Sequence, residues 1–295
     1  MSVDADKPVI SVVLPVYNGA ATIDSQLGAL SAQVNAPDWE LIVADNGSTD
    51  ATLERVERWR LVLPNLRVID ASSRRGVSFA RNVAIREARA DTWALCDADD
   101  VVGPNWVQAM ADALKSGHLV TGPRESVSLN SAETTLRPAT RQVALPTFPT
   151  FLPYATGCNM GATRDIFERI GGFDELLQAG GDDIDFSWRA QIAGAKLVWV
   201  DAALVSYRHR EGLRQGWKQV HAYARANPHL YVRFRKHGMR RRPVGTVARK
   251  VGWLMKNALA ALLPKRLHLR KTWLLVSAEL TGHLRGSWEA RALYL

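Results

Sequence analysis

Hydrophobic and polar positions alternate in blocks along the first 122 residues of the chain. Short apolar runs rich in β-branched residues, several of them ending in an acid or a turn, predict buried strands at residues 9–16, 40–45, 66–70, 92–96 and 118–122. Apolar positions three or four apart predict helices between them, at residues 22–32, 50–59, 77–88 and 104–115. Strands and helices that alternate at this spacing are typical of a parallel sheet covered by helices on both faces.

The pattern changes after residue 122. Residues 123–154 are rich in Pro, Thr and Ser and lack a clear period, which predicts an irregular or hairpin-forming excursion on the cleft side of the sheet. We then expect helices and strands again, at residues 164–170, 181–193 and 196–200. The last part is predicted to be mostly helical, with two basic amphipathic stretches at 247–262 and 267–280 that are separated by Pro264.

An acid cluster, Asp97-Ala98-Asp99-Asp100, directly follows a buried apolar run. Ionised carboxylates are costly to bury without a partner, so the strand must end here, at the edge of the sheet that faces a ligand cleft. Asp97 and Asp99 point the same way in extended backbone, and two carboxylates on one side suit Mg²⁺ or Mn²⁺. A solvated acidic turn would explain Asp-x-Asp equally well, and the context has to decide between the two.

Length and cysteine content limit the classes of protein to which this chain can belong. The 295 residues suffice for one large domain or for a domain with an appendage, and 47% of them are hydrophobic. The two cysteines, Cys96 and Cys158, exclude a disulfide framework and suit a reducing compartment. Residues 1–8 lack a signal-peptide pattern, and no apolar run is long enough to predict a transmembrane helix. We therefore expect a cytoplasmic protein.

The positive charge is concentrated at the back of the chain. Between Gly212 and Ala278 there are 16 Lys and Arg and no Asp or Glu, whereas the rest carries 22 basic and 29 acidic residues. This asymmetry predicts an anionic partner, either a membrane surface or nucleic acid. Basic amphipathic helices with Trp253 and Trp273 favour peripheral docking at the inner face of a membrane through residues 212–278. No nucleic-acid module is visible, so nucleic acid is the weaker choice. Helices that pack on the front part and leave a solvated basic face are the remaining alternative.

Six short motifs now occur in order over about two thirds of the chain. They are Pro15-Val16-Tyr17-Asn18, Val43-Ala44-Asp45-Asn46-Gly47-Ser48-Thr49-Asp50, Gly76-Val77-Ser78-Phe79-Ala80-Arg81-Asn82, Asp97-Ala98-Asp99-Asp100, Gly171-Gly172-Phe173-Asp174-Glu175, and Gly181-Asp182-Asp183-Ile184-Asp185 with Trp188-Arg189. With these motifs the chain from Val9 to His209 resembles the inverting nucleotide-sugar glycosyltransferases of family 2, which have the GT-A fold.

The resemblance implies a fold and a division of the chain. The fold is an α/β fold of GT-A type, with a Rossmann-like, mostly parallel sheet, helices on both faces, and here a C-terminal basic helical extension. Residues 1–210 would form the catalytic domain, with a nucleotide-sugar half at 1–122 and an acceptor half at 123–210. Residues 211–295 would form a basic amphipathic helical tail that associates with a membrane.

The resemblance also implies roles for single residues. Carried over position by position, the donor-binding residues are Pro15, Val16, Tyr17, Asn18, Asp45, Arg81, Asp97 and Ala98. The metal ligands are Asp99, with Asp97 as a shared contact, and His209, which could equally be a polar residue at a strand end. The catalytic base is Asp183 or Asp182. The acceptor-side residues are Gly157, Asp185, Trp188 and Arg189.

These roles are chemically consistent. A sugar hydroxyl is a poor nucleophile, so a carboxylate must take its proton as it attacks, and the neighbours Asp182 and Asp185 should raise the pKa of Asp183. One base and one direct displacement invert the anomeric carbon, while Mg²⁺ or Mn²⁺ offsets the charge of the departing nucleoside diphosphate. Two departures from the family pattern matter. Asn46 replaces a frequent Asp, and Asp182 replaces a frequent Glu, which leaves the choice of base open.

The sequence therefore predicts a glycosyltransferase that uses a nucleotide-sugar donor, with UDP favoured, and a glycan or lipid-linked acceptor in cell-surface polysaccharide or glycolipid synthesis. An inactive nucleotide-sugar-binding or regulatory module, with its basic tail on membrane or nucleic acid, is the alternative from another class. The sugar, the acceptor and the pathway depend on pocket residues that no motif determines.

Overall fold

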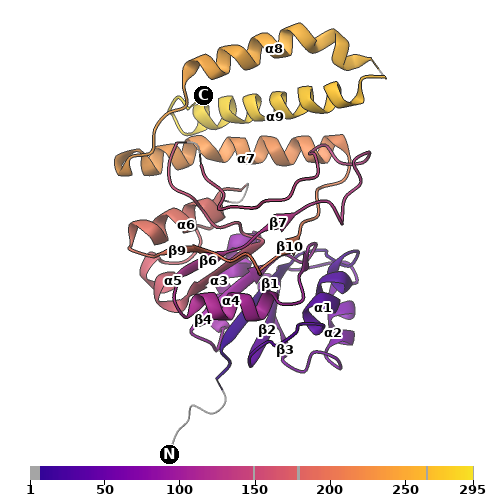
Figure 1. Cartoon of the computed structure of the whole chain (residues 1–295), viewed down its shortest axis with the longest axis vertical. Coiled ribbons are helices and arrows are strands. Elements are labelled where there is room, and N and C mark those ends of the chain that lie inside the picture. Colours follow the sequence, from indigo (N-terminus) through magenta and orange to yellow (C-terminus); the bar gives the residue numbers. More distant parts are fainter. Residues whose placement is uncertain (1–6, 149, 178–179, 264, 295) are drawn as a thin grey trace, which may run out of the picture.

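The computed structural model describes residues 7–148, 150–177, 180–263 and 265–294. A seven-stranded sheet with the order β3-β2-β1-β4-β8-β6-β9 forms its centre (Figure 1). The strands are β1 (Ile10–Val16), β2 (Trp39–Asp45), β3 (Leu66–Asp70), β4 (Thr92–Cys96), β6 (Leu119–Thr121), β8 (Asn159–Thr163) and β9 (Leu197–Trp199). The helices around them are α1 (Ile23–Ser31), α2 (Thr52–Trp59), α3 (Val77–Glu87), α4 (Trp106–Leu114), α5 (Arg164–Ile170) and α6 (Asp182–Ile192).

The sheet is mostly parallel, as the sequence predicts. β1 to β4 run parallel to one another, and their pairing aligns Val16 at the end of β1 with Asp45 at the end of β2. β8 lies antiparallel between β4 and β6, and β9 is parallel to β6. The sequence analysis assigned no strand to β8, because its small residues, such as Gly161 and Ala162, carry little β-propensity.

Helices cover both faces of the sheet, since successive strand residues point to opposite sides. Val12 and Leu14 of β1 pack with α1, α2 and α4 in one apolar core. Val13 of β1 and Leu95 of β4 pack with α3, α5 and α6 in a second core on the other face. These two layers hold the carboxyl ends of β1, β2 and β4 together at one edge.

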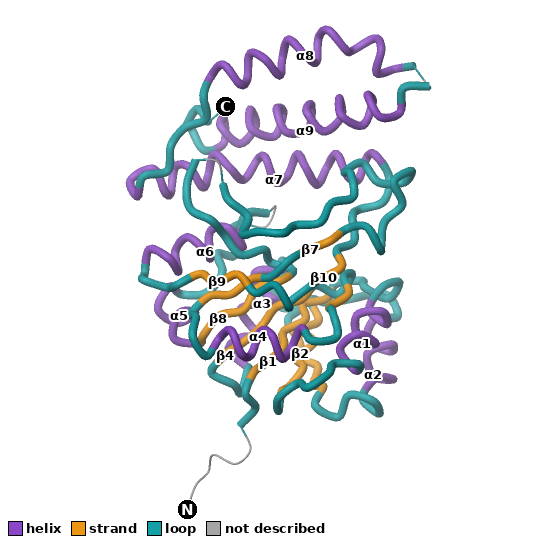
Figure 2. Tube along the Cα trace, in the orientation of Figure 1, coloured by secondary structure: helices purple, strands orange, loops and turns teal. Residues whose placement is uncertain are grey.

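A small second sheet lies beside that edge. It has the order β5-β10-β7 and consists of β5 (Val101–Val102), β7 (Arg124–Glu125) and β10 (Val205–Ser206). The described part of the excursion at 123–154 is otherwise irregular, with isolated bridges such as the one between Glu125 and Arg141. Figure 2 shows these loops between the central sheet and the first helix of the tail.

The tail consists of α7 (Leu213–Phe234), the short 3₁₀ helix η1 (Arg235–His237), α8 (Val244–Leu262) and α9 (Leu267–Glu289). Figure 1 shows α7 nearest the sheet, α9 beyond it and α8 outermost. α7 joins the catalytic part through an aromatic cluster in which Trp188 of α6 packs against Phe234 of α7. Among the helices that the structure describes, none is long and apolar enough to cross a membrane.

α7 and α9 approach each other closely through small residues. A side chain at Gly282 would lie 2.4 Å from the His221 carbonyl, and one at Gly286 would lie 2.2 Å from the Arg225 carbonyl. Only glycine fits such approaches of backbone to backbone. α8 packs on α9, where Glu279 forms ion pairs with Lys250 and Arg242. Two basic residues of the tail, Arg242 and Lys250, are thus paired within the tail.

Candidate active site

Two turns at the carboxyl ends of β1 and β2 form the side of the site where the sequence predicts donor binding. Pro15 and Val16 are buried, while Tyr17 is 52% exposed and carries the Arg75 guanidinium 4.3 Å above its ring. Asn18 has a left-handed φ of 51° and accepts a hydrogen bond from the Thr49 backbone N–H at 2.8 Å. The exposed tyrosine is therefore held next to the turn that follows β2.

Asp45 holds that second turn in place. Its carboxylate accepts hydrogen bonds from the backbone N–H groups of Gly47 and Ser48 at 3.1–3.2 Å. Asn46, which replaces the frequent second Asp, is buried and donates to the carbonyls of Ala71 and Arg74. An amide suits this position because it can donate two hydrogen bonds, which an ionised carboxylate cannot do.

The acid cluster occupies the turn between β4 and β5. Asp97 and Asp99 have side chains that are each 29% exposed, whereas Asp100 is fully buried. One Asp100 oxygen accepts the Arg208 backbone N–H at 2.8 Å, and the other has no partner. Burial raises the pKa of Asp100 well above its ordinary value, and the charges of Asp97 and Asp99 add to this. Negative charge in this turn is thus only partly compensated.

The ligand atoms at this turn suit a divalent cation. Ligand atoms of Asp97, Asp100 and Cys158 lie within 4.8 Å of one another, which is the one such group among the described residues. The carboxylate oxygens suit Mg²⁺ or Mn²⁺, and the thiol does not. Asp99 is not in this group, and it forms an ion pair with Arg210 at 3.2 Å. Burial, followed by the charge of Asp97, raises the pKa of Asp99 even so.

Arg81 of α3 connects the acid cluster with the start of α6. Its guanidinium is 5% exposed and donates to Asp182 at 2.6 Å, to Asp97 at 3.1 Å and to the Gly157 carbonyl at 3.3 Å. Burial acts to lower the pKa of Arg81, but Asp182, Asp97 and Asp183 raise it above its ordinary value. A side chain at Gly157 would lie 3.0 Å from the guanidinium, so only glycine allows this approach without displacement.

The three acids of α6 have different surroundings. Asp182 is bound by Arg81, and Asp185 is fully buried in ion pairs with Arg189 and Arg233. Asp183 has no ion pair within the described residues, and its carboxylate accepts the Gly157 N–H at 2.9 Å. Burial, and then the charge of Asp182, raises the pKa of Asp183 to about 6. The first turn of α6 therefore holds one carboxylate that is poised to exchange a proton near neutral pH.

Three of the predicted acceptor-side residues do not face the cleft. Trp188 is fully buried among Phe148, Phe151 and Phe234, with ring centroids 4.9–5.1 Å away. Asp185 and Arg189 pair with each other, and Arg189 also donates to two backbone carbonyls of the turn after α5. Their prediction as acceptor contacts is corrected, because these side chains fasten α6 to its neighbours. Gly157, in contrast, lies directly beside Asp183.

His209 lies apart from the acid cluster. Its neighbours Arg208 and Arg210 contact Asp99 and Asp100, whereas the His209 backbone N–H donates to the Asn130 side chain at 2.6 Å. The His209 ring is 8% exposed, packs against Tyr207 and has both nitrogens without a hydrogen-bond partner. Burial, and then the charges of Arg137 and Arg124, lowers its pKa. The Pro138 carbonyl lies near the ring, but without hydrogen-bond geometry.

Several residues at this edge were missed from the sequence. Arg210, Arg124 and Tyr154 belong to segments that the sequence analysis left without regular structure or without a role. The alternation of aromatic and basic residues in Tyr207-Arg208-His209-Arg210 has the period of a strand. It would have indicated that Arg208 and Arg210 share one face.

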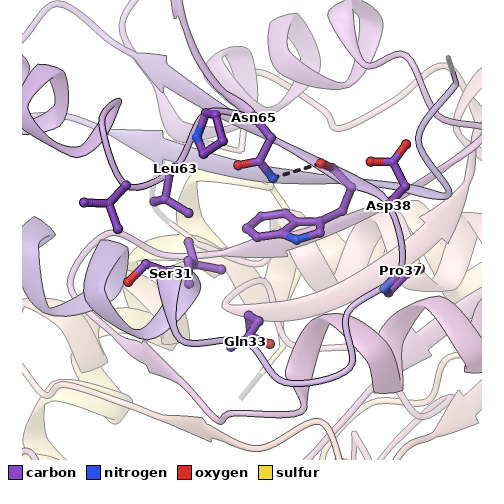
Figure 3. A pocket seen from close by; sticks show the side chains of 10 residues that line it. Ser31, Gln33, Pro37, Asp38, Leu63 and Asn65 are labelled. Atoms are coloured by element: carbon purple, nitrogen blue, oxygen red, sulfur yellow. Dashed lines mark hydrogen bonds between the residues drawn. The ribbon is translucent and has the colours of Figure 1, made fainter.

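A surface pocket of about 370 Å³ lies elsewhere (Figure 3). It is lined by residues from the end of α1, the start of β2 and the segment before β3, including Ser31, Gln33 and Asn65. In Figure 3 the Asn65 amide points to the Trp39 carbonyl, to which it donates at 2.9 Å. This pocket lies at the amino-terminal ends of the strands and lacks clustered titratable groups, so it is not the candidate site.

The fold and the site together define an α/β protein with a ligand cleft at the carboxyl ends of its strands. The family description "Glycosyl transferase family 2" matches residues 11–171, and "Glycosyl transferase family group 2" matches residues 94–281. The chain therefore belongs to glycosyl transferase family 2, and the family prediction from its motifs is confirmed.

Relatives of known name are glycosyltransferases and a polysaccharide biosynthesis protein. The chain is 30% identical over 224 residues to validoxylamine A glucosyltransferase of Streptomyces hygroscopicus subsp. limoneus, covering 65% of this chain and 49% of that protein. It is 30% identical over 220 residues to the succinoglycan biosynthesis protein ExoO of Rhizobium meliloti, covering 70% of this chain and 62% of that protein. The chain thus spans between about half and two thirds of these relatives.

Solved structures show the same fold. The mannosyltransferase PcManGT from Pyrobaculum calidifontis, in complex with GDP-Man and Mn²⁺, matches with a TM-score of 0.65 at 19% identity, over 97% of this chain and 88% of that one. S. aureus TarS 1–349 in complex with UDP-GlcNAc matches with a TM-score of 0.54 at 19% identity, over 97% and 93%. The predicted GT-A fold class is thereby confirmed.

Proposed function

We propose that this chain is an inverting, metal-dependent glycosyltransferase. It moves a sugar from a nucleoside-diphosphate donor, with UDP favoured, to a hydroxyl of a glycan or lipid-linked acceptor in cell-surface polysaccharide or glycolipid synthesis. The observation that carries the proposal is the isolation of Asp183, the one acid of α6 without an ion pair among the described residues, next to a second cluster of acids.

In this proposal Asp183 is the base. The acceptor hydroxyl loses its proton to the Asp183 carboxylate as its oxygen bonds to the anomeric carbon, and the bond to the diphosphate oxygen breaks. The Gly157 N–H orients the carboxylate, and a pKa of about 6 keeps most of it ionised at neutral pH. Asp182 is the poorer candidate, because its oxygen is bound by Arg81 at 2.6 Å.

Asp97, Asp99 and Asp100 would hold Mg²⁺ or Mn²⁺, which supplies positive charge for the departing diphosphate. The unpartnered Asp100 oxygen supports this, because a cation could bind it. Burial, followed by the charges of neighbouring aspartates, raises the pKa values of Asp99 and Asp100, and a bound cation would offset that repulsion. The mannosyltransferase PcManGT, whose solved structure is a complex with GDP-Man and Mn²⁺, also supports it. Tyr17 and Asp45 would border the nucleotide base.

A thermal-shift panel of nucleotide sugars with Mn²⁺, Mg²⁺ or EDTA tests donor binding. A ligand that binds only the folded state raises the melting temperature by mass action. We expect stabilisation by at least one nucleoside diphosphate sugar, and only with a divalent cation. An inactive binding module would show the same shift without hydrolysis or transfer of the donor sugar. Absence of any shift would contradict the proposed function.

We further propose that α8 docks the protein on the inner face of an anionic membrane. The helix leaves a row of apolar side chains exposed, namely Val251 at 38%, Met255 at 76%, Leu259 at 83% and Leu262 at 72%. These positions lie within about 80° of one another on a helix that turns 100° per residue. Exposed apolar rows of this kind on a monomer mark interaction surfaces.

The charge beside this row favours lipid over another protein surface. Lys256 and Arg249 are exposed on the same helix, and Lys265 and Arg266 follow its end. Between Gly212 and Ala278 the chain contains no acid that would repel an anionic lipid. Apolar burial and charge together provide the two weak anchors that reversible membrane binding requires.

Flotation with neutral vesicles and with vesicles containing an anionic phospholipid tests this docking. We expect binding to the anionic vesicles and loss of binding in Leu259→Asp. Leu61→Asp is the matched control, since Leu61 is 94% exposed and lies before β3, in the catalytic part of the chain. No binding to either vesicle would contradict the docking proposal. Concentration-dependent dimerisation that Leu259→Asp abolishes would assign the row to a second copy of the chain instead.

A further inference from the structure

A cysteine lies beside the acid cluster because of the way β4 and β8 pair. Their antiparallel register places Cys96 opposite Asn159. One position beyond this pair, the register brings Asp97 and Cys158 next to each other. Ligand atoms of Asp97, Asp100 and Cys158, one from each residue, lie within 4.8 Å of one another. We call these three residues the thiol–acid group.

Both carboxylates of the group keep an oxygen that no described residue occupies. Arg81 donates to one oxygen of Asp97 at 3.1 Å, and the other oxygen accepts no hydrogen bond from the described residues. Asp100 is fully buried, and one of its oxygens has no hydrogen-bond partner in the same part of the chain. Buried polar atoms in native proteins are nearly always paired, so this oxygen indicates a partner from outside the chain.

The sulfur changes which cations the group suits. Mg²⁺ and Mn²⁺ prefer oxygen ligands, whereas Zn²⁺ and other thiophilic cations accept a thiolate together with carboxylates. Zinc needs only three protein ligands when water or another molecule takes the fourth position of a tetrahedron.

The spacing of the group is close to what such a cation requires. Bonds of about 2.3 Å to sulfur and about 2.1 Å to oxygen set two tetrahedral ligands about 3.6 Å apart. The three atoms of the thiol–acid group already lie within 4.8 Å of one another. The Asp97 side chain is 29% exposed, so a cation can reach the group from solvent on that side.

Binding through sulfur exchanges a proton for the metal. The S–H bond of Cys158 breaks, a metal–sulfur bond forms from the same electron pair, and the proton leaves to solvent. Burial, and then the charge of Asp100, raises the pKa of Cys158, and this opposes the exchange. The nearby charge of Arg124 repels a cation as well. Only a cation that bonds strongly to sulfur can overcome both effects, which excludes Mg²⁺ from this mode of binding.

We propose that Asp97, Asp100 and Cys158 bind a thiophilic divalent cation such as Zn²⁺, and that this cation competes with Mg²⁺ or Mn²⁺ for the acid cluster. The competition rests on the proposed function, whereas the thiophilic site itself does not. Asp97 and Asp100 belong to both sets of ligands, so one cation excludes the other. Asp99 lies outside the thiol–acid group and is a ligand only of the oxygen-bound cation.

Titration with Cd²⁺ tests the site directly, because a cadmium–thiolate bond has a charge-transfer absorption in the ultraviolet. The full chain is used without an affinity tag or nucleotide, and a phosphine keeps its thiols reduced. We expect a band that saturates at one Cd²⁺ per chain and that a large excess of Mn²⁺ reduces. Absence of the band overturns the proposal, and a band that no excess of Mn²⁺ reduces refutes the competition.

The two cysteines of the chain provide a matched pair of variants. Cys158→Ala should abolish the band and weaken Cd²⁺ binding by about tenfold or more. Cys96→Ala should retain both, because Cys96 is equally buried but lies outside the thiol–acid group. Melting temperatures without metal show whether each variant is folded. A band that survives in Cys158→Ala, or that only Cys96→Ala abolishes, overturns the proposal.

Asp100→Asn tests the group with both thiols in place. The amide oxygen can still accept the Arg208 backbone N–H, to which Asp100 is bonded at 2.8 Å. We expect the variant to bind Cd²⁺ more weakly than the native protein, because one carboxylate ligand is lost. An unchanged affinity would refute the three-ligand site.

Failure of the proposed function gives a different result. If no nucleoside diphosphate sugar with Mn²⁺ raises the melting temperature of the native protein, donor binding is wrong, but the Cd²⁺ band is still expected. If a nucleotide sugar and Mn²⁺ bind but Cd²⁺ gives no band, the proposed function stands and the thiophilic site is refuted.

Discussion

Two runs of the chain, residues 97–100 and 182–185, each hold three aspartates in four positions, yet the fold treats them differently. In the second run Arg81 neutralises Asp182, and Arg189 with Arg233 neutralises Asp185. In the first run Asp97 shares Arg81 with Asp182, and Asp99 pairs with Arg210, which is 62% exposed. Asp100 has no ion pair within the described residues.

The difference shows how one residue type can serve two kinds of chemistry. Ion pairs with Arg81, Arg189 and Arg233 compensate two charges of the second run and leave Asp183 as a single base with a pKa of about 6. The first run keeps its charge close together, as a cation site requires, and its buried member, Asp100, has a raised pKa. Whether a carboxylate suits proton transfer or metal binding thus depends on the groups around it and not on its spacing in the sequence.

The largest effect is expected from removing the proposed base. Asp183→Asn should reduce sugar transfer about 10²–10⁴-fold, because no group then takes the hydroxyl proton, while donor affinity stays within about twofold. Transfer rates and nucleotide titrations measure the two quantities. Glu133→Gln, an exposed acid of the excursion, should behave like the native protein. Normal turnover by Asp183→Asn would contradict the assignment.

Removing the buried cation should affect stability most. Arg81→Met leaves Asp97 and Asp182 without their shared partner, and breaking a buried pair from one side costs about 3–5 kcal/mol. Urea denaturation measures the loss. Arg86→Met is the control on the exposed side of α3, where a change within about 0.5 kcal/mol is expected. Equal stability of the two variants would show that Arg81 does not hold the acids together.

A smaller effect is expected at the proposed cation site. Asp99→Ala should weaken nucleotide binding in the presence of Mn²⁺ by roughly tenfold or more and leave metal-free binding unchanged. Isothermal titration with and without Mn²⁺ separates the two contributions. An affinity that does not respond to Asp99→Ala under either condition would remove Asp99 from the metal site.

The smallest effect concerns Arg210. The guanidinium competes with a cation for Asp99, but an ion pair this exposed is worth only about 0–1 kcal/mol. Arg210→Gln should therefore tighten Mn²⁺-dependent nucleotide binding by a few-fold at most. Weaker binding in Arg210→Gln would mean that the arginine contacts the donor and does not merely occupy the metal ligand.

Much of the fold could be predicted because β1 to β4 are apolar runs that end in turns or acids. The spacing of apolar residues indicates which side of an element is buried. The helix at residues 164–170 was therefore predicted at its observed bounds. β8 escaped prediction because its pairing with β4 and β6 depends on distant partners and not on its own small residues. The exposed apolar row on α8 includes Val251, Met255 and Leu262, which the hydrophobic period assigns to the apolar face of this helix.

The sequence predicted which residues form the candidate site better than it predicted what surrounds each of them. The motifs located Asp183 and the acid cluster, but the sequence left Asp182 and Asp183 equivalent as bases. Only the ion pair of Arg81 with Asp182, between residues 101 positions apart, separates the two. Trp188 and Arg189 were misplaced because a motif gives positions and not which side of a helix faces the cleft.

The central claim is that one ionised aspartate, Asp183, takes the proton of the acceptor. Its pKa of about 6 means that the carboxylate is protonated, and unable to act as a base, below that pH. The measurement is the pH dependence of kcat/KM for transfer between about pH 5 and 8. We predict a rate that rises through about pH 6 and reaches a plateau near pH 7, because kcat/KM follows the ionised fraction of the free enzyme's base. A rate that stays constant across this range, or falls as the pH rises through 6, would contradict the account.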